Sequence, residues 1–168
     1  MLLIFDSYRN PRTGLLCHIQ FIEIFVVVSK SKILSQRENE ILKEKELKAS
    51  DKTGFIHGEK KATCFQEVPL NAIVENLMYD EAIKALDNRK KDGPRYSWFG
   101  IRCSKEKVFK KGGRPVFYGE IKELEKMIPE DQHWRIVALN YLKDDYLIDW
   151  THEREWRCPD NYSFEYQD

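Results

Sequence analysis

Residues Asp149 to Cys158 read Asp-Trp-Thr-His-Glu-Arg-Glu-Trp-Arg-Cys and are followed by Pro159. Proline lacks the backbone N–H that a strand donates to its neighbour, so the stretch is expected to be a strand that ends there. Alternate side chains of a strand share a face. One face would carry Trp150, His152, Arg154, Trp156 and Cys158, and the other Asp149, Thr151, Glu153, Glu155 and Arg157. We expect the tryptophan face to belong to the core and the carboxylate face to form the wall of a site.

The carboxylate face allows two interpretations. Glu153 and Glu155, two positions apart on one strand face, would lie about 7 Å apart. At that separation they raise each other's pKa and together can hold a hydroxyl or a cationic transition state. In the second interpretation the strand is exposed, and Glu155 and Arg157 form a weak surface ion pair. The residues alone leave both open.

Composition limits the classes of function. The 168 residues, 42% hydrophobic and 33% charged, fit one soluble globular domain. Because 28 basic and 28 acidic residues cancel, strong general binding to nucleic acid is not expected. The four cysteines form no CxxC or Cys/His cluster, so we expect reduced thiols, no metal site and a cytoplasmic protein. No signal peptide or bilayer-spanning run is recognised, and no membrane association is expected.

Patterning along the chain predicts a single α+β domain, residues 15–168, after a loosely held lead-in, residues 1–14. The apolar run from Phe21 to Val28 indicates a buried central strand, whose end near Ser29 would lie at the mouth of a cleft. Residues 62–69 predict another strand, with Gln66 near its end. The other expected strands are 98–104, 116–121 and 133–142, the first two paired as a hairpin, and the expected helices are 33–47, 71–90 and 123–128. The basic stretch 105–111 is interpreted as a solvated loop. The sheet would be mostly antiparallel, with two or three helices.

Three stretches carry a family resemblance. They are Cys64-Phe65-Gln66-Glu67-Val68-Pro69-Leu70, then Phe99-Gly100-Ile101-Arg102 with Ser104-Lys105 and Gly112 to Tyr118, then Glu153-Arg154-Glu155-Trp156-Arg157. Together they resemble the AbiG-type abortive-infection proteins of bacteria and their relatives in phage defence. One partner of the AbiG pair is labelled an antitoxin, so the resemblance implies a protein partner, which would be a toxin, an antitoxin or a phage protein.

A second resemblance concerns chemistry. Glu153-Arg154-Glu155 with the following Trp156 is similar to the Glu-x-Glu strand of ADP-ribosyltransferases. The resemblance implies that Glu155 holds the ribose hydroxyls of NAD and stabilises the oxocarbenium-like cation, while Glu153 steers or deprotonates the acceptor. Such enzymes hold NAD through an arginine or histidine on the first core strand, and residues 19–28 contain neither. Either His18, before that run, or Arg37, beyond it, fills this role, or the cofactor is held differently, or no NAD binds. The candidate cofactor-binding residues are Ser29, Gln66, Arg102, Arg114 and Tyr118.

Two further functions compete with the transferase. A metal-dependent nuclease is suggested by Glu120-Ile121-Lys122, which would place a carboxylate and an ammonium group at the end of the strand 116–121. A non-catalytic binding module, such as an antitoxin or a sensor of phage protein, would instead leave Glu153 and Glu155 exposed or locked in salt bridges.

Overall fold

The computed structural model describes residues 23–27, 36–52, 55–87, 100–141 and 147–166. The lead-in and Ser29 lie outside these residues. The helices are α1 Gln36–Glu44, α2 Leu70–Asp87, α3 Lys105–Lys110, α4 Ile121–Met127, and the 3-10 turns η2 Glu130–Arg135 and η3 Thr151–Glu153. The strands are β1 Glu23–Val27, β2 Glu46–Leu47, β3 Ala62–Gln66, β4 Gly100–Ser104, β5 Arg114–Pro115, β6 Phe117–Gly119, β7 Ile136–Ala138, β8 Glu155–Pro159 and β9 Tyr162–Ser163. The predicted α+β class with mostly antiparallel sheet is confirmed.

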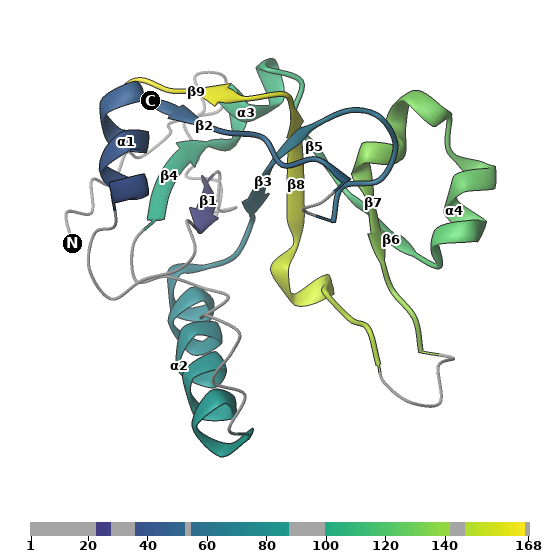
Figure 1. Cartoon of the computed structure of the whole chain (residues 1–168), viewed down its shortest axis with the longest axis horizontal. Helices are drawn as coiled ribbons and strands as arrows, with labels where there is room; N and C mark the ends of the chain where they lie inside the picture. Colours follow the sequence, from purple (N-terminus) through teal and green to yellow (C-terminus); the bar gives the residue numbers. More distant parts are fainter. Residues whose placement is uncertain (1–22, 28–35, 53–54, 88–99, 142–146, 167–168) are drawn as a thin grey trace, which may run out of the picture.

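A five-stranded sheet in the order β4-β1-β3-β8-β5 forms the centre of the fold (Figure 1). Its β1 lies between two partners, in the inner position that the apolar run 21–28 predicted. The pairings of β1, β3, β4, β5 and β8 in this sheet are all antiparallel. The N-terminal end of β8 is therefore directly opposite the C-terminal end of β3, where Glu155 pairs with Gln66.

The two faces of the sheet differ in chemistry because the side chains alternate. Phe65 and Trp156 face each other across β3 and β8 and enter the main core, as predicted for the tryptophan face. The ring of Phe65 meets that of Tyr162 edge-on at 5.0 Å between centroids. This core comprises Leu47, Phe65, Cys103, Val108, Trp156, Cys158, Tyr162 and Phe164. The opposite face of the same strands carries polar side chains and forms the candidate site.

The predicted hairpin between residues 98–104 and 116–121 is wrong. The basic stretch between them is not a loop but helix α3, whose Val108 is fully buried and whose Glu106 and Lys110 form an i,i+4 ion pair. The helix directs β4 to β1 and β5 to β8, so the two segments do not pair. Gly113 makes the tight return possible, because a Cβ there would lie 2.4 Å from Val108 Cγ1 and 2.7 Å from its carbonyl oxygen.

The segment predicted as one strand over residues 133–142 is divided between the end of the 3-10 turn η2, residues 133–135, and the strand β7, residues 136–138. Trp134 is buried within η2, and only β7 is extended, pairing in parallel with β6. Apolar alternation over this short run fits either structure, which explains the error. Figure 1 shows β6, β7 and α4 together beside the β5 edge of the main sheet. The short helix predicted over residues 123–128 corresponds to α4.

Helix α2 follows β3 and extends away from the sheet (Figure 1). Its Ile73 and Leu77 are buried with Val68, as the helical spacing predicted. On the exposed side lie Val74, Met78 and Tyr79. No helix in the described ranges combines the length and apolar character needed to cross a membrane.

Candidate functional site

The strand predicted over residues 149–158 begins only at Glu155. Asp149 accepts hydrogen bonds from Thr151, from its backbone N–H at 2.9 Å and its hydroxyl at 2.6 Å, and this starts the turn η3. Arg154 then takes a left-handed conformation with φ 46°. Glu153 therefore lies on a turn rather than two positions along a strand from Glu155. The predicted alternation of the two carboxylates on one face is wrong, because local hydrogen bonds at Asp149 compete with the sheet ladder.

Glu155 and Arg157 form a buried ion pair, not the exposed pair of the second interpretation. Their side chains are 8% and 4% exposed, and Arg157 Nε donates to Glu155 Oε1 at 2.8 Å. The contact from Nη2 to Oε2 is long, at 3.5 Å. Arg157 Nη1 donates to the carbonyls of Trp134 and Ile136 at 2.8 and 3.0 Å. The carboxylate is thus oriented mainly through Oε1.

Strand register brings Gln66, Glu155 and Arg102 into one row. Gln66 is directly opposite Glu155, and Phe25 is opposite both Gln66 and Arg102 on its two sides. Residues opposite each other in antiparallel strands share a face, so these side chains leave the same side of the sheet. With strands about 4.8 Å apart, Arg102 lies about 14 Å from Glu155 along the row.

Gln66 has an unsatisfied amide oxygen. It is 7% exposed, and its Oε1 has no hydrogen-bond partner among the described residues. Buried polar atoms of native proteins are nearly always paired, so this atom points to a missing donor.

Tyr118 lies at the same place from a different element. Tyr118 belongs to β6, and its hydroxyl accepts a hydrogen bond from the backbone N–H of Glu155 at 2.6 Å. Burial raises the pKa of Tyr118 to about 12, and the charges of Glu155 and Glu153 act in the same direction. Tyr118 is therefore a neutral phenol at ordinary pH, and Glu153 is close enough to influence it.

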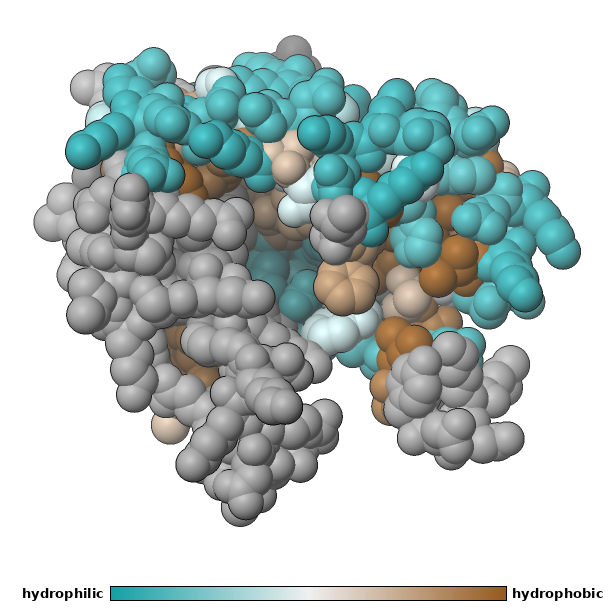
Figure 2. Space-filling view, in the orientation of Figure 1, coloured by the Kyte–Doolittle hydropathy of each residue, from teal (hydrophilic) through white to brown (hydrophobic). Residues whose placement is uncertain are grey.

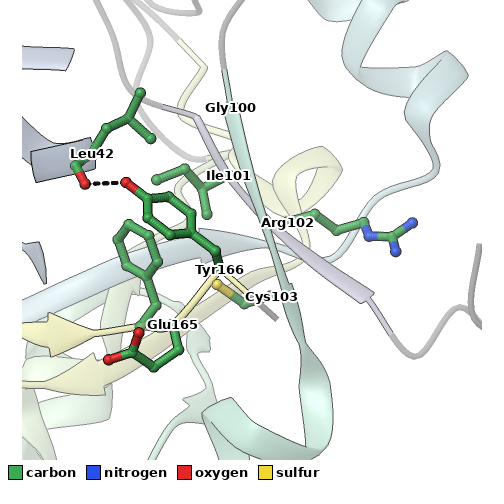
Figure 3. A pocket seen from close by; sticks show the side chains of 8 residues that line it. Leu42, Gly100, Ile101, Arg102, Cys103, Glu165 and Tyr166 are labelled. Carbon is green, nitrogen blue, oxygen red and sulfur yellow. Dashed lines mark hydrogen bonds between the residues drawn. The ribbon is translucent and has the colours of Figure 1, made fainter. Parts of the chain in front are cut away.

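The two candidate arginines have separate positions. Arg114 Nη1 donates to the carbonyls of Phe109 and Gly113 at 2.8 and 2.6 Å, and its guanidinium covers the Phe109 ring at 3.7 Å. It thus fixes the turn after α3. Figure 3 shows a pocket of about 220 Å³ near the C-terminus, with Arg102 pointing away from it. Arg102 is consequently directed to the polar face.

The two residues that suggested a nuclease, Glu120 and Lys122, belong to the start of a helix rather than to a strand site. Glu120 caps helix α4 by accepting the Glu123 N–H at 3.1 Å, and Lys122 lies within that helix. Glu120 directly follows β6, but its carboxylate is used in the cap. In the part of the chain that the structure describes, no group of three His, Cys, Asp or Glu side chains is arranged to hold a metal ion.

Glu67 anchors the corner that precedes Glu155, a role that sequence patterning did not assign. It is 14% exposed, and its Oε2 accepts from Trp156 Nε1 at 2.6 Å. Its Oε1 accepts from Lys105 at 2.6 Å and from Arg154 at 3.3 Å. Lys105 also lies 4.9 Å from the centre of the Trp156 ring. The position of Glu67 near the end of the predicted strand, residues 62–69, was the signal available in the sequence.

Glu67→Ala is expected to lower the free energy of unfolding by about 2 kcal/mol, because the Trp156 indole N–H loses its charged acceptor. Urea unfolding followed by tryptophan fluorescence measures the loss. Glu59→Ala is the matched control, since its pair with Lys52 is 82% exposed on the glutamate side and should cost little. Equal costs for the two variants would refute the anchoring role.

Asp149 makes the turn before Glu155 sensitive to acid. Hydrogen bonds from Thr151 and then Tyr141 lower the pKa of Asp149 from 3.8 to about 2. A carboxyl whose pKa is lowered by folding stabilises the fold above its unfolded pKa, and this contribution disappears as pH falls from about 4 to about 2. Comparing wild type with Asp149→Asn by urea unfolding from pH 2 to 5 should show a stability difference that shrinks toward pH 2. A difference independent of pH would contradict the assignment.

The surface is recessed near the end of β3 and the beginning of β8. Figure 2 shows a hollow near the middle of the view, in the region where Figure 1 places the end of β3 and the beginning of β8, with hydrophilic residues at its base. The candidates Gln66, Glu155 and Tyr118 are brought together there by β3, β8 and β6. No family model, curated protein or solved structure matches the chain, so its own residues carry the functional assignment.

Proposed function

We propose that the chain is an NAD-using ADP-ribosyltransferase-like effector or toxin of bacterial phage defence. The observation that supports this most is the proximity of three residues. Gln66 lies opposite Glu155 on the polar face of the sheet, and the Tyr118 hydroxyl contacts the Glu155 backbone. Gln66 also keeps a buried oxygen without a hydrogen-bond donor among the described residues. A pre-oriented carboxylate beside polar groups in a recess is what a sugar-cleaving site requires.

Each residue has a role in this reaction. Arg157 orients the Glu155 carboxylate through Oε1, which leaves Oε2 to accept from a ribose hydroxyl. As the bond between ribose and nicotinamide breaks, positive charge develops on the sugar, and the Glu155 charge stabilises it. Nicotinamide leaves with the bonding electron pair. In the proposed reaction Glu153, on the turn η3, takes the proton of the attacking acceptor.

Arg102 extends the site along the sheet. Its distance of about 14 Å from Glu155 along the row suits a group further along a dinucleotide, and a guanidinium binds phosphate oxygens well. Arg114, held by Phe109 and Gly113, is the weaker candidate for the diphosphate.

The test is titration calorimetry with NAD on wild type and on Glu155→Gln, together with measurement of nicotinamide release. Glutamine is preferred to alanine because it still offers an oxygen to Arg157 Nε, whose hydrogen bond to residue 155 would otherwise be lost. Binding by wild type and loss of release in the variant support the proposal. A folded wild type that neither binds NAD nor releases nicotinamide excludes it.

A second candidate is the antitoxin or sensor-type binding module. It is favoured by the buried salt bridge of Glu155 and by the exposed apolar residues Val74, Met78 and Tyr79 of α2. This function predicts that Met78→Glu abolishes the effect in cells while Glu155→Gln retains it. The transferase predicts the reverse.

A further inference from the structure

Two hydrogen-bond acceptors lie side by side on the polar face. Gln66 and Glu155 are directly opposite in the antiparallel pair of β3 and β8, which places their Cβ atoms about 5 Å apart. Gln66 Oε1 is buried and without a donor among the described residues. Glu155 Oε2 receives a long contact of 3.5 Å from Arg157, and the Cys64 thiol also hydrogen-bonds to the Glu155 carboxylate.

The charge balance of this cluster restricts the ligand. Arg157 already neutralises Glu155 at 2.8 Å, and Gln66 is uncharged. A ligand group with two cationic donors, such as a second guanidinium, would add an unbalanced charge beside two residues that are each 7% exposed. A neutral ligand group with two adjacent O–H donors has no such penalty.

A sugar diol has this chemistry. The neighbouring hydroxyls of a furanose ring each carry one proton to donate, and they project from adjacent carbons toward acceptors that are themselves neighbours. A deoxy sugar would leave one buried acceptor unpaired, which is the strongest means by which a polar site rejects an analogue.

We propose that Gln66 Oε1 and Glu155 Oε2 accept hydrogen bonds from the two vicinal hydroxyls of one ribose, so that the site selects ribose over deoxyribose. The inference rests on the proposed use of NAD and identifies the sugar as the nicotinamide ribose. Gln66 is thereby a specificity-determining residue. Its unsatisfied oxygen in the free protein is the acceptor reserved for the ligand.

The experiment titrates NAD, and NAD analogues that lack the 2′ or the 3′ hydroxyl of the nicotinamide ribose, into wild type and Gln66→Met. Wild type should bind both analogues about tenfold more weakly than NAD. Gln66→Met should bind NAD about tenfold more weakly and no longer distinguish NAD from one of the analogues. Its urea midpoint should not fall, because methionine removes a buried oxygen that has no donor.

Thr63→Val is the matched control on the same strand. Thr63 is 4% exposed on the other face, and its hydroxyl donates to the Asp160 carbonyl at 2.8 Å. Its loss should lower the urea midpoint without changing NAD affinity.

The outcomes separate this inference from the proposed function. If wild type binds NAD but Gln66→Met binds NAD and both analogues as wild type does, the diol assignment is overturned and the transferase proposal stands. If folded wild type does not bind NAD, both are overturned.

Discussion

Arg157→Met is expected to lower the free energy of unfolding by about 3–5 kcal/mol. The substitution leaves the Glu155 carboxylate, 8% exposed, without its counter-charge. It also removes the donors to the Trp134 and Ile136 carbonyls, through which Arg157 ties β8 to η2 and β7. Urea unfolding followed by the fluorescence of the four tryptophans measures the change.

Two comparisons make this prediction specific. Lys110→Ala breaks the exposed pair with Glu106 and should cost at most about 0.5 kcal/mol. The double variant Glu155→Gln with Arg157→Met should be more stable than Arg157→Met alone, because no unpaired charge stays buried. If the single and double variants are equally stable, the ion pair is not what stabilises this part of the fold.

In the proposed transferase reaction, Glu155→Gln is expected to reduce nicotinamide release from NAD by about 10²–10³-fold, because the charge assigned to stabilise the developing cation is lost. The variant should be less stable than wild type, because the buried Arg157 loses its counter-charge, but it should still fold, since the glutamine oxygen can accept from Arg157 Nε. Initial rates of nicotinamide release measure the effect, and circular dichroism of wild type and variant shows whether both are folded.

Glu153→Gln is the informative control. Glu153 lies on η3, outside the Gln66–Glu155 pair, and is proposed to act on the acceptor. Glu153→Gln should therefore lower the rate of ADP-ribose transfer to an acceptor more than the rate of NAD hydrolysis by water. A folded Glu155→Gln protein with wild-type turnover would end the catalytic assignment of Glu155.

Much of the secondary structure was predictable from the sequence. The inner strand β1, the strand β3 and the helices α1, α2 and α4 all fall within or beside their expected ranges. These segments have long apolar runs or clear helical spacing, which are the strongest local signals. The pairing was less predictable, because α3 was hidden in a lysine-rich stretch whose only core residue is Val108.

The candidate site was predicted in part. Glu155, Gln66 and Tyr118 were selected from the sequence and meet in the structure. The buried partner Arg157 was a surface residue in one of the two interpretations, and Glu67 received no role. Both errors concern burial, which depends on what other segments place above a strand and cannot be read from the strand itself.

The sequence by itself determined that Trp156 and Cys158 face the core and that Glu155 and Arg157 face away from it, because alternation along a strand is a local property. Only the tertiary structure decided that the polar face is buried, since η2 and β7 bring two carbonyls onto Arg157 and β3 brings Gln66 opposite Glu155. Partners from distant positions set the polarity around a charge, and that environment distinguishes a solvated ion pair from a fixed carboxylate in a site.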